Sequence, residues 1–192
     1  MIFLIDMEEY KLTYDRVLTD IEQTARHIVT KWSPYGIKLA TAESCTGGMI
    51  SSAITAISGS SSVIELGVCS YSNRIKHEVL GVSEKTLEQY SEYSTQCAEE
   101  MALGVMRLSG ADFAVATTGV AGPTGGSDEH PVGEVCIAVC SKKAIYSKRF
   151  VFDQPTEGAP SQRDDIRAQA ARKAFVLLDL RIMTELNAKD QN

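Results

Sequence analysis

The chain has 192 residues, the length of one domain with a single sizeable core rather than of two domains. Its net charge of −6 argues against a broad nucleic-acid-binding surface, although a local arginine site can still bind a small anion. No run approaches the roughly 20 apolar residues of a membrane span, and five cysteines without a C-x-x-C pair predict reduced thiols in a cytoplasmic protein.

The first half of the chain predicts an amphipathic helix followed by strands that alternate with helices. Residues 1–11 carry a five-residue apolar run, too short for the core of a signal peptide, and acidic residues follow it. Helical spacing then connects Tyr14, Val17, Leu18, Ile21, Ala25, Ile28 and Trp32, before Pro34 and Gly36 end the pattern. Beyond these we expect a strand (37–41), a helix rich in small residues (47–57), a loop (58–62), a strand (63–71) and a short helix capped by Gly81.

The second half predicts two serine-capped helices, three strands and a long final helix. Helices begin near Ser83 and Ser94, and the second is expected to end at Gly110 and to bury Cys97, Ala98, Met101, Val105 and Leu108. Strands are expected at 113–118, 134–140 and 144–152, with a Gly/Pro loop at 119–131 of a length that is usually functional or mobile. A helix from about Ser161 turns inward Ile166, Ala170, Ala174, Leu177, Leu178 and Ile182, and residues 187–192 are expected to fray.

Strands interleaved with helices predict an α/β fold, a three-layer α/β/α sandwich. The two adjacent strands between residues 134 and 152 favour a mixed sheet over a purely parallel one. We expect residues 1–36 to form an N-terminal helical extension that packs on a domain of residues 37–192.

The segment TAESCTGG (41–48) is the first candidate site, because it places Ser44 beside Cys45 between a predicted strand and a predicted helix. Such a turn exposes a side chain where helix N–H groups point, which suits an oxyanion or an anionic ligand. The same residues can also form a simple capped turn, a common role of Ser and Thr.

A serine nucleophile needs a base, and none of the three histidines is obviously placed to serve. Lys76 is the alternative, since burial can lower the pKa of a lysine enough for it to accept a proton. Tyr71 lies five residues earlier and could relay the proton between serine and lysine. The competing interpretation is an ordinary surface lysine on a short amphipathic helix.

Two arginines, Arg163 and Arg167, lie four residues apart at the start of the last predicted helix. A cation near a helix N-terminus is unfavourable by the dipole argument, so the pair points to an anion held between the guanidinium groups. Ion pairs with Asp164, Asp165 or Glu157 would account for the arginines equally well.

No metal or organic cofactor is expected. The three histidines do not belong to a recognised metal spacing, and the glycine-rich segments lack both the G-K-[ST] ending of a phosphate loop and a G-x-G-x-x-G fingerprint.

With these segments in view, the chain resembles the CinA C-terminal domain family, also called PncC, the nicotinamide mononucleotide deamidases. The residues that carry the resemblance are TAESCTGG (41–48), SGSSSVIELG (58–67), YSNRIKHEVLGV (71–82), TTGVAGPTGGSDEHPVGEV (117–135) and RDDIRAQAARKA (163–174). Their order and spacing cover about residues 37 to 180, nearly the whole predicted domain.

The resemblance implies an α/β/α domain that hydrolyses the carboxamide of nicotinamide mononucleotide, releasing ammonia and leaving nicotinic acid mononucleotide. The family's catalytic serine, lysine and tyrosine fall on Ser44, Lys76 and Tyr71. The substrate-binding residues that we expect are Thr46, Gly47, Gly48, Thr118, Arg163 and Arg167, of which Arg167 is added from the helix spacing. The partners expected are this nucleotide and further copies of the chain, as a homodimer or higher homo-oligomer, with neither nucleic acid nor membrane.

Two positions depart from the family pattern. SQR precedes the last helix where Gly-Asp-Arg is usual, and Glu134 stands where a neutral residue is commoner, so that a carboxylate near the pocket could weaken phosphate binding. The larger domain that precedes this module in longer CinA proteins is absent, so we expect a stand-alone deamidase. The alternatives are a non-catalytic nucleotide-binding or competence-associated interaction module, and an amidase for another carboxamide, which the paired arginines disfavour.

Overall fold

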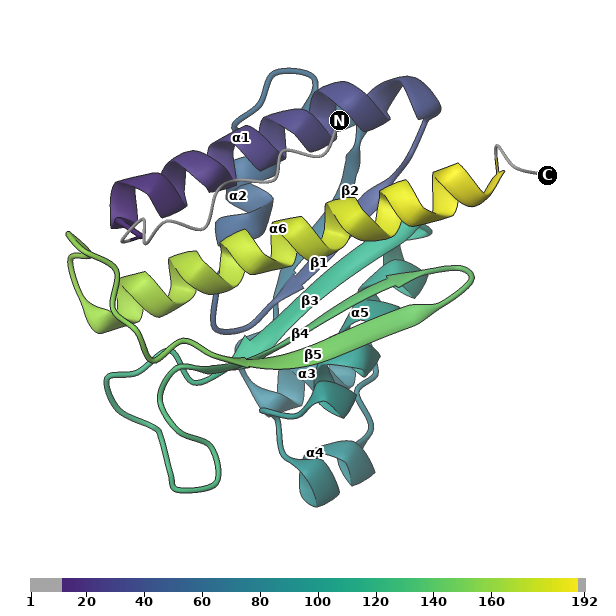
Figure 1. Cartoon of the computed structure of the whole chain (residues 1–192). Coiled ribbons are helices and arrows are strands. Elements are labelled where there is room, and N and C mark those ends of the chain that lie inside the picture. The colour runs from purple at the N-terminus through teal and green to yellow at the C-terminus, as the bar shows by residue number, and fades with distance from the viewer. Residues whose placement is uncertain (1–11, 190–192) are drawn as a thin grey trace.

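The structure, a computed structural model, describes residues 12–189 (Figure 1). The apolar run at the N-terminus and the last three residues of the tail that we expect to fray lie outside the described residues. Helices within this range are α1 (Tyr14–Trp32), α2 (Met49–Thr55), α3 (Asn73–Leu80), α4 (Glu84–Tyr90), α5 (Thr95–Ser109) and α6 (Gln162–Lys189). Short 3-10 turns cover Ser33–Tyr35 and Ser60–Ser62.

One mixed sheet forms the middle layer. Its strands are β1 (Leu39–Glu43), β2 (Ile64–Cys69), β3 (Phe113–Gly119), β4 (Glu134–Ser141) and β5 (Ile145–Val151), arranged in the order β2-β1-β3-β4-β5. β1 runs parallel to β2 and β3, whereas β4 is antiparallel to β3 and β5. The predicted mixed sheet is therefore confirmed.

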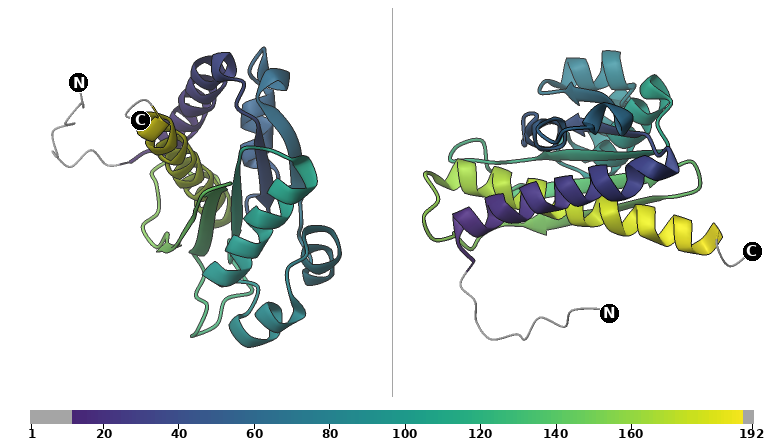
Figure 2. Two further views of the ribbon diagram at one scale, coloured as in Figure 1. Left: turned by 90° about the vertical axis from the view of Figure 1, so that its right-hand side faces the viewer. Right: turned by 90° about the horizontal axis from the view of Figure 1, so that it is seen from above.

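Helices cover both faces of the sheet, as the three-layer prediction requires. Figure 2 shows α1 and α6 side by side on one face and α5 on the other. Buried Ile28, Ile54 and Phe175 belong to the core between the sheet and α1, α2 and α6. Leu80 and Met101 belong to the core of the opposite face. Because both faces are covered, β1 and β4 are buried along their whole length.

Some details differ from the sequence predictions. Leu18 and Leu108 follow the apolar spacing of their helices but are 39% and 55% exposed. Periodicity identifies the apolar face of a helix and does not show where along the helix the partner surface ends. The first strand covers 39–43 rather than 37–41, because a buried acidic residue, Glu43, continues it.

The topology brings three strand ends to one edge of the sheet. β1, β2 and β3 are parallel, so Glu43, Cys69 and Gly119 end at the same edge. The connection after β1 uses α2 on one face, whereas the connection after β2 passes through α5 on the other. Such a switch point opens a crevice beyond the carboxyl ends of β1 and β3, and Ser44 directly follows β1.

Candidate active site

Ser44 is the first residue of the turn that leaves β1. Its N–H donates to Thr117 O at 2.9 Å, and Gly47 N–H donates to Ser44 O at 3.1 Å. Gly47 and Gly48 adopt φ of 61° and 91°, a left-handed conformation that glycine tolerates best. The paired glycines therefore allow the sharp entry into α2 that leaves Ser44 at the strand end.

The Glu43 side chain accepts hydrogen bonds from residues of this turn and of α2. Its fully buried carboxylate accepts hydrogen bonds from Ile50 N at 3.1 Å, from Ser51 N at 2.9 Å and from the hydroxyls of Ser51 and Thr46. These donors satisfy the charge and fasten the start of α2 to the end of β1. The sequence reasoning missed this residue, although an acidic side chain among the small residues of a strand is itself a signal of a buried polar role.

Lys76 provides the side chain that contacts the serine. It lies on α3, which Ser72 caps through a 3.3 Å bond from Ile75 N, and only 2% of the lysine is exposed. Lys76 Nζ lies 3.2 Å from Ser44 Oγ. Burial lowers the pKa of the Lys76 ammonium below its ordinary value of 10.5, and nearby acidic groups and thiols oppose that shift only in part. The lowered pKa increases the share of neutral amine beside the Ser44 hydroxyl, and a neutral amine in this place is what general-base catalysis requires.

The thiol of Cys45, the other candidate nucleophile, is buried and has a raised pKa. It is 5% exposed, and burial raises the pKa of its thiol to about 12. The nucleophilic form of cysteine is the thiolate, which is scarce at neutral pH when the pKa is this high. The high pKa of the Cys45 thiol and the contact of Lys76 with Ser44 Oγ therefore favour the serine of the adjacent pair.

Tyr71 and Arg163 meet at the mouth of the site. Tyr71 is 65% exposed, and its hydroxyl accepts a hydrogen bond from Arg163 Nη2 at 2.9 Å. Arg163 Nη1 donates to Gly122 O at 2.7 Å. The SQR segment supports this geometry, because Ser161 Oγ accepts from Asp164 N at 3.1 Å and so caps the start of α6.

These residues surround one pocket of about 260 Å³. Five of the residues discussed from the sequence line it, namely Ser44, Cys45, Tyr71, Lys76 and Arg163. Added to them are Asn73, Glu92, Tyr93, Gly119, Val120, Ala121, Gly122, Thr124 and Gly125. The Gly/Pro loop after β3 thus supplies much of the wall, whereas Glu92 and Tyr93 come from the α4–α5 connection, which no sequence motif had marked.

Other expected binding residues lie around the pocket rather than in its lining. Thr46 Oγ1 bonds to Glu43 and Thr117, and Thr118 Oγ1 donates to Glu92 O at 2.6 Å. Arg167 donates to Thr46 O at 3.1 Å and lines a separate hollow beside α1 and α2. That hollow also contains Gly47 and Gly48.

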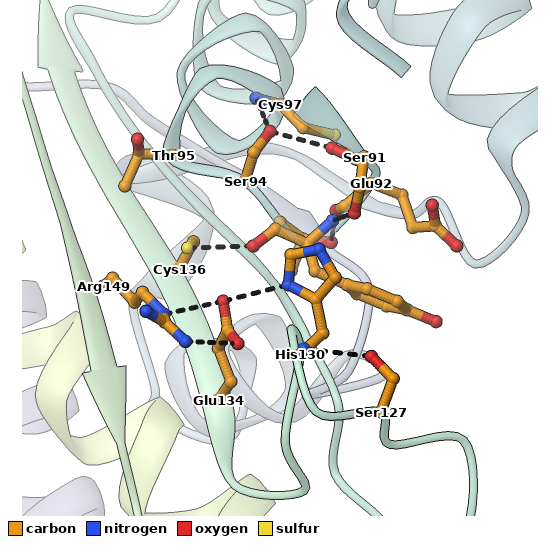
Figure 3. A network of polar contacts seen from close by, with 12 residues as sticks. Ser91, Glu92, Ser94, Thr95, Cys97, Ser127, His130, Glu134, Cys136 and Arg149 are labelled. Atoms are coloured by element: carbon orange, nitrogen blue, oxygen red, sulfur yellow. Dashed lines mark hydrogen bonds and ion pairs between the residues drawn. The ribbon is translucent and has the colours of Figure 1, made fainter. Parts of the chain in front are cut away.

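Glu134, the second departure from the family pattern, is paired with neighbouring side chains. It is 2% exposed and forms a 2.8 Å salt bridge with Arg149, while His130 Nδ1 lies 3.3 Å from the same carboxylate (Figure 3). It is not among the residues that line the pocket. Its charge is thus compensated within the sheet.

Between residues 12 and 189, no three His, Cys, Asp or Glu side chains cluster in a way that could hold a metal ion. Within the same range, no helix combines the length and the apolar character needed to cross a bilayer.

Comparison with known proteins gives a consistent family. The model of the CinA C-terminal domain matches residues 21–182. A protein of Enterobacter agglomerans called nicotinamide-nucleotide amidohydrolase PncC is 47% identical over 136 residues, which are 70% of this chain and 83% of that protein. A CinA-like protein of Shewanella pealeana is 40% identical over 88% of this chain, and the chain spans 38% of the length of that curated relative.

Solved structures share the fold. The competence/damage inducible protein CihA of Agrobacterium tumefaciens matches with a TM-score of 0.77 and 40% identity, over 88% of this chain and 96% of that one. A CinA superfamily protein of Klebsiella pneumoniae matches with a TM-score of 0.78 and 32% identity, over 85% of this chain and 98% of that one. With a family model that covers most of its length and solved relatives of the same fold, the chain belongs to the CinA C-terminal domain family.

Proposed function

We propose that this protein hydrolyses the carboxamide of nicotinamide mononucleotide, giving nicotinic acid mononucleotide and ammonia. The observation that carries the proposal is the 3.2 Å contact between Lys76 Nζ and Ser44 Oγ inside a pocket that Arg163 also lines. The relative from Enterobacter agglomerans, named as a nicotinamide-nucleotide amidohydrolase, supports the same substrate class.

The reaction begins at the serine. Neutral Lys76 takes the Ser44 proton directly, the route that their contact favours, and the oxygen attacks the amide carbon. The lysine, now an ammonium, lies beside the developing oxyanion and stabilises it together with N–H groups of the Thr46–Gly48 turn. Gly47 N–H donates to Ser44 O in this structure, so its contribution requires that bond to lengthen.

Collapse of the tetrahedral intermediate breaks the C–N bond. Lys76 gives its proton to the leaving nitrogen, which departs as ammonia and leaves an ester on Ser44. Water, activated by the same neutral lysine, then hydrolyses the ester and regenerates the serine. One water is consumed and one ammonia released in each cycle, with no change of oxidation state.

Arg163 and Tyr71 act at the pocket mouth. We assign Arg163 to the 5′-phosphate, because a guanidinium binds phosphate oxygens well and lies at the open end of the pocket. Tyr71, whose hydroxyl accepts from Arg163, assists by fixing that guanidinium and by closing the mouth over the bound nucleotide. Binding energy from the remote phosphate then positions the amide at Ser44.

Release of ammonia from nicotinamide mononucleotide tests the proposal. We expect turnover by the wild-type protein and by Cys45→Ala, and loss of at least about a thousandfold in kcat for Ser44→Ala, which removes the nucleophile. Ser44→Ala should still bind the nucleotide in calorimetry. If the wild-type protein binds the nucleotide and releases no ammonia, the chain is a nucleotide-binding module instead, the class in which a competence-associated role would fall.

A further inference from the structure

One wall of the pocket comes from the short connection between α4 and α5. Ser91 has φ of 70°, a positive value that residues other than glycine rarely adopt, at the position where the chain turns toward the pocket. Its hydroxyl accepts from Tyr93 N at 3.0 Å, and its carbonyl accepts from Ser94 Oγ at 2.8 Å. The connection is therefore a defined turn, and Glu92 and Tyr93 at its tip line the pocket.

The sheet holds this turn in place. Thr118 Oγ1 donates to Glu92 O at 2.6 Å, and Cys136 Sγ lies 3.1 Å from Tyr93 O. The Tyr93 ring meets the His130 ring edge-on with centroids 5.4 Å apart. Because both carbonyls and one ring are anchored, the two side chains are presented to the pocket from a preorganised backbone.

The pocket lining contains a carboxylate, that of Glu92. The residues that line the pocket include two basic side chains, Lys76 and Arg163, and one acidic side chain, Glu92. None of the salt bridges between described residues includes Glu92. Burial, and then the nearby Glu92 carboxylate, raise the pKa of the Tyr93 phenol above its ordinary value. The Glu92 charge also acts on Lys76, where it raises the lysine pKa against the larger effect of burial. When Lys76 is neutral, as the proposed reaction requires, this half-buried carboxylate beside an aromatic ring is a site for a positive charge.

We propose that Glu92 and Tyr93 form a subsite for the fixed positive charge of a pyridinium ring, so that the enzyme selects oxidised over reduced nicotinamide nucleotides. This inference rests on the proposed function. With the amide at Ser44 and the phosphate at Arg163, the ring lies between them. Its nitrogen is separated from the amide-bearing carbon by one ring carbon, so the charge stays close to the reacting end. The reduced nucleotide has the same amide and phosphate, but its ring is neutral.

Binding to a protein that cannot turn over the ligand tests the subsite. In a Ser44→Ala background, calorimetry compares nicotinamide mononucleotide with its dihydropyridine form. We expect the oxidised nucleotide to bind more tightly, and Glu92→Gln to weaken its binding about tenfold, the effect of losing one charged contact. The same change should alter binding of the reduced nucleotide less than about twofold. Glu88→Gln, an exposed neighbour on α4 outside the pocket, removes the same formal charge and should change neither.

The outcomes separate this inference from the proposed function. Equal weakening of both nucleotides by Glu92→Gln, or no effect on either, would overturn the cation subsite while leaving the amidase intact. Glu92→Asp, which keeps the charge, should keep a preference for the oxidised ring, and loss of that preference would assign the effect to loop shape. If neither nucleotide binds to Ser44→Ala and the wild-type protein releases no ammonia, the proposed function fails and the subsite fails with it.

Discussion

Lys76 is the residue whose environment most directly controls the proposed chemistry. Burial lowers the pKa of its ammonium below 10.5, so the neutral amine that can accept the Ser44 proton is populated at lower pH than in an exposed lysine. We therefore expect kcat/KM for nicotinamide mononucleotide to rise with pH and to level off once the pH exceeds that lowered pKa. A pH–rate profile measures this, with Lys85→Ala, an exposed lysine of α4, as a control that leaves the profile unchanged. A profile that falls as pH rises through the alkaline range below 10.5 would contradict the role of Lys76 as base.

Site residues that lie in a local sequence motif could be predicted from the sequence. Site residues whose position depends on contacts between distant parts of the chain could not. The turn around Ser44 and the lysine near Tyr71 could be found because strand ends and capped helices leave local patterns. Glu43 escaped because its bonding partners become visible only when the helix that follows folds back onto the strand. Glu92 could not be predicted because contacts with β3 and β4 bring the α4–α5 connection to the pocket.

Among the elements, α3 is positioned by an unusually close approach to α5. Leu80 is the last residue of α3, and a Cβ built on Gly104 of α5 would lie 2.0 Å from its carbonyl oxygen. Gly→Ala in an open helix stabilises by about 1 kcal/mol, whereas a backbone clash of this kind costs about 1–3 kcal/mol or more. The clash wins, so we expect Gly104→Ala to destabilise the protein in urea unfolding and to lower kcat, because α3 carries Lys76.

The sign of that effect makes the experiment decisive. Stabilisation by Gly104→Ala would show that the helices separate freely and that their contact does not position Lys76. Gln96→Ala, at an exposed position of the same helix, should change stability by less than about 0.5 kcal/mol.

Element order and type could be predicted from periodicity and turn residues, whereas element length could not. α2 covers 49–55 rather than 47–57, because Gly47 and Gly48 belong to the turn that follows Ser44. Arg163 and Arg167 share a helix and a spacing of four, yet Arg163 reaches the pocket and Arg167 a hollow beside α1 and α2. Spacing along one helix fixes a face, and the elements packed on either side decide what each residue meets.

Across the whole molecule, α1 and α6 join the two ends of the sequence. Trp32 Nε1 donates to Asp179 Oδ1 at 2.8 Å, and Arg172 forms a 2.7 Å salt bridge with Asp20. Ile28 is fully buried in the core that also contains Phe175. The family model begins at residue 21, inside α1. The expected division of the chain at residue 36 stays a prediction, and the packing of α1 provides a way to test whether that division is also one of stability.

If α1 shares one cooperative core with the sheet, a cavity made in α1 must destabilise the entire protein. Ile28→Ala removes buried carbon atoms and should cost about 3 kcal/mol of unfolding free energy, seen as one urea transition at a lower midpoint. Leu18→Ala, on the same helix but 39% exposed, should cost less than about 1 kcal/mol. Two separate transitions in Ile28→Ala, with ammonia release retained after the first, would instead make α1 an independent extension. A single transition would mean that residues far from Ser44 in the sequence maintain the sheet edge on which the site is built.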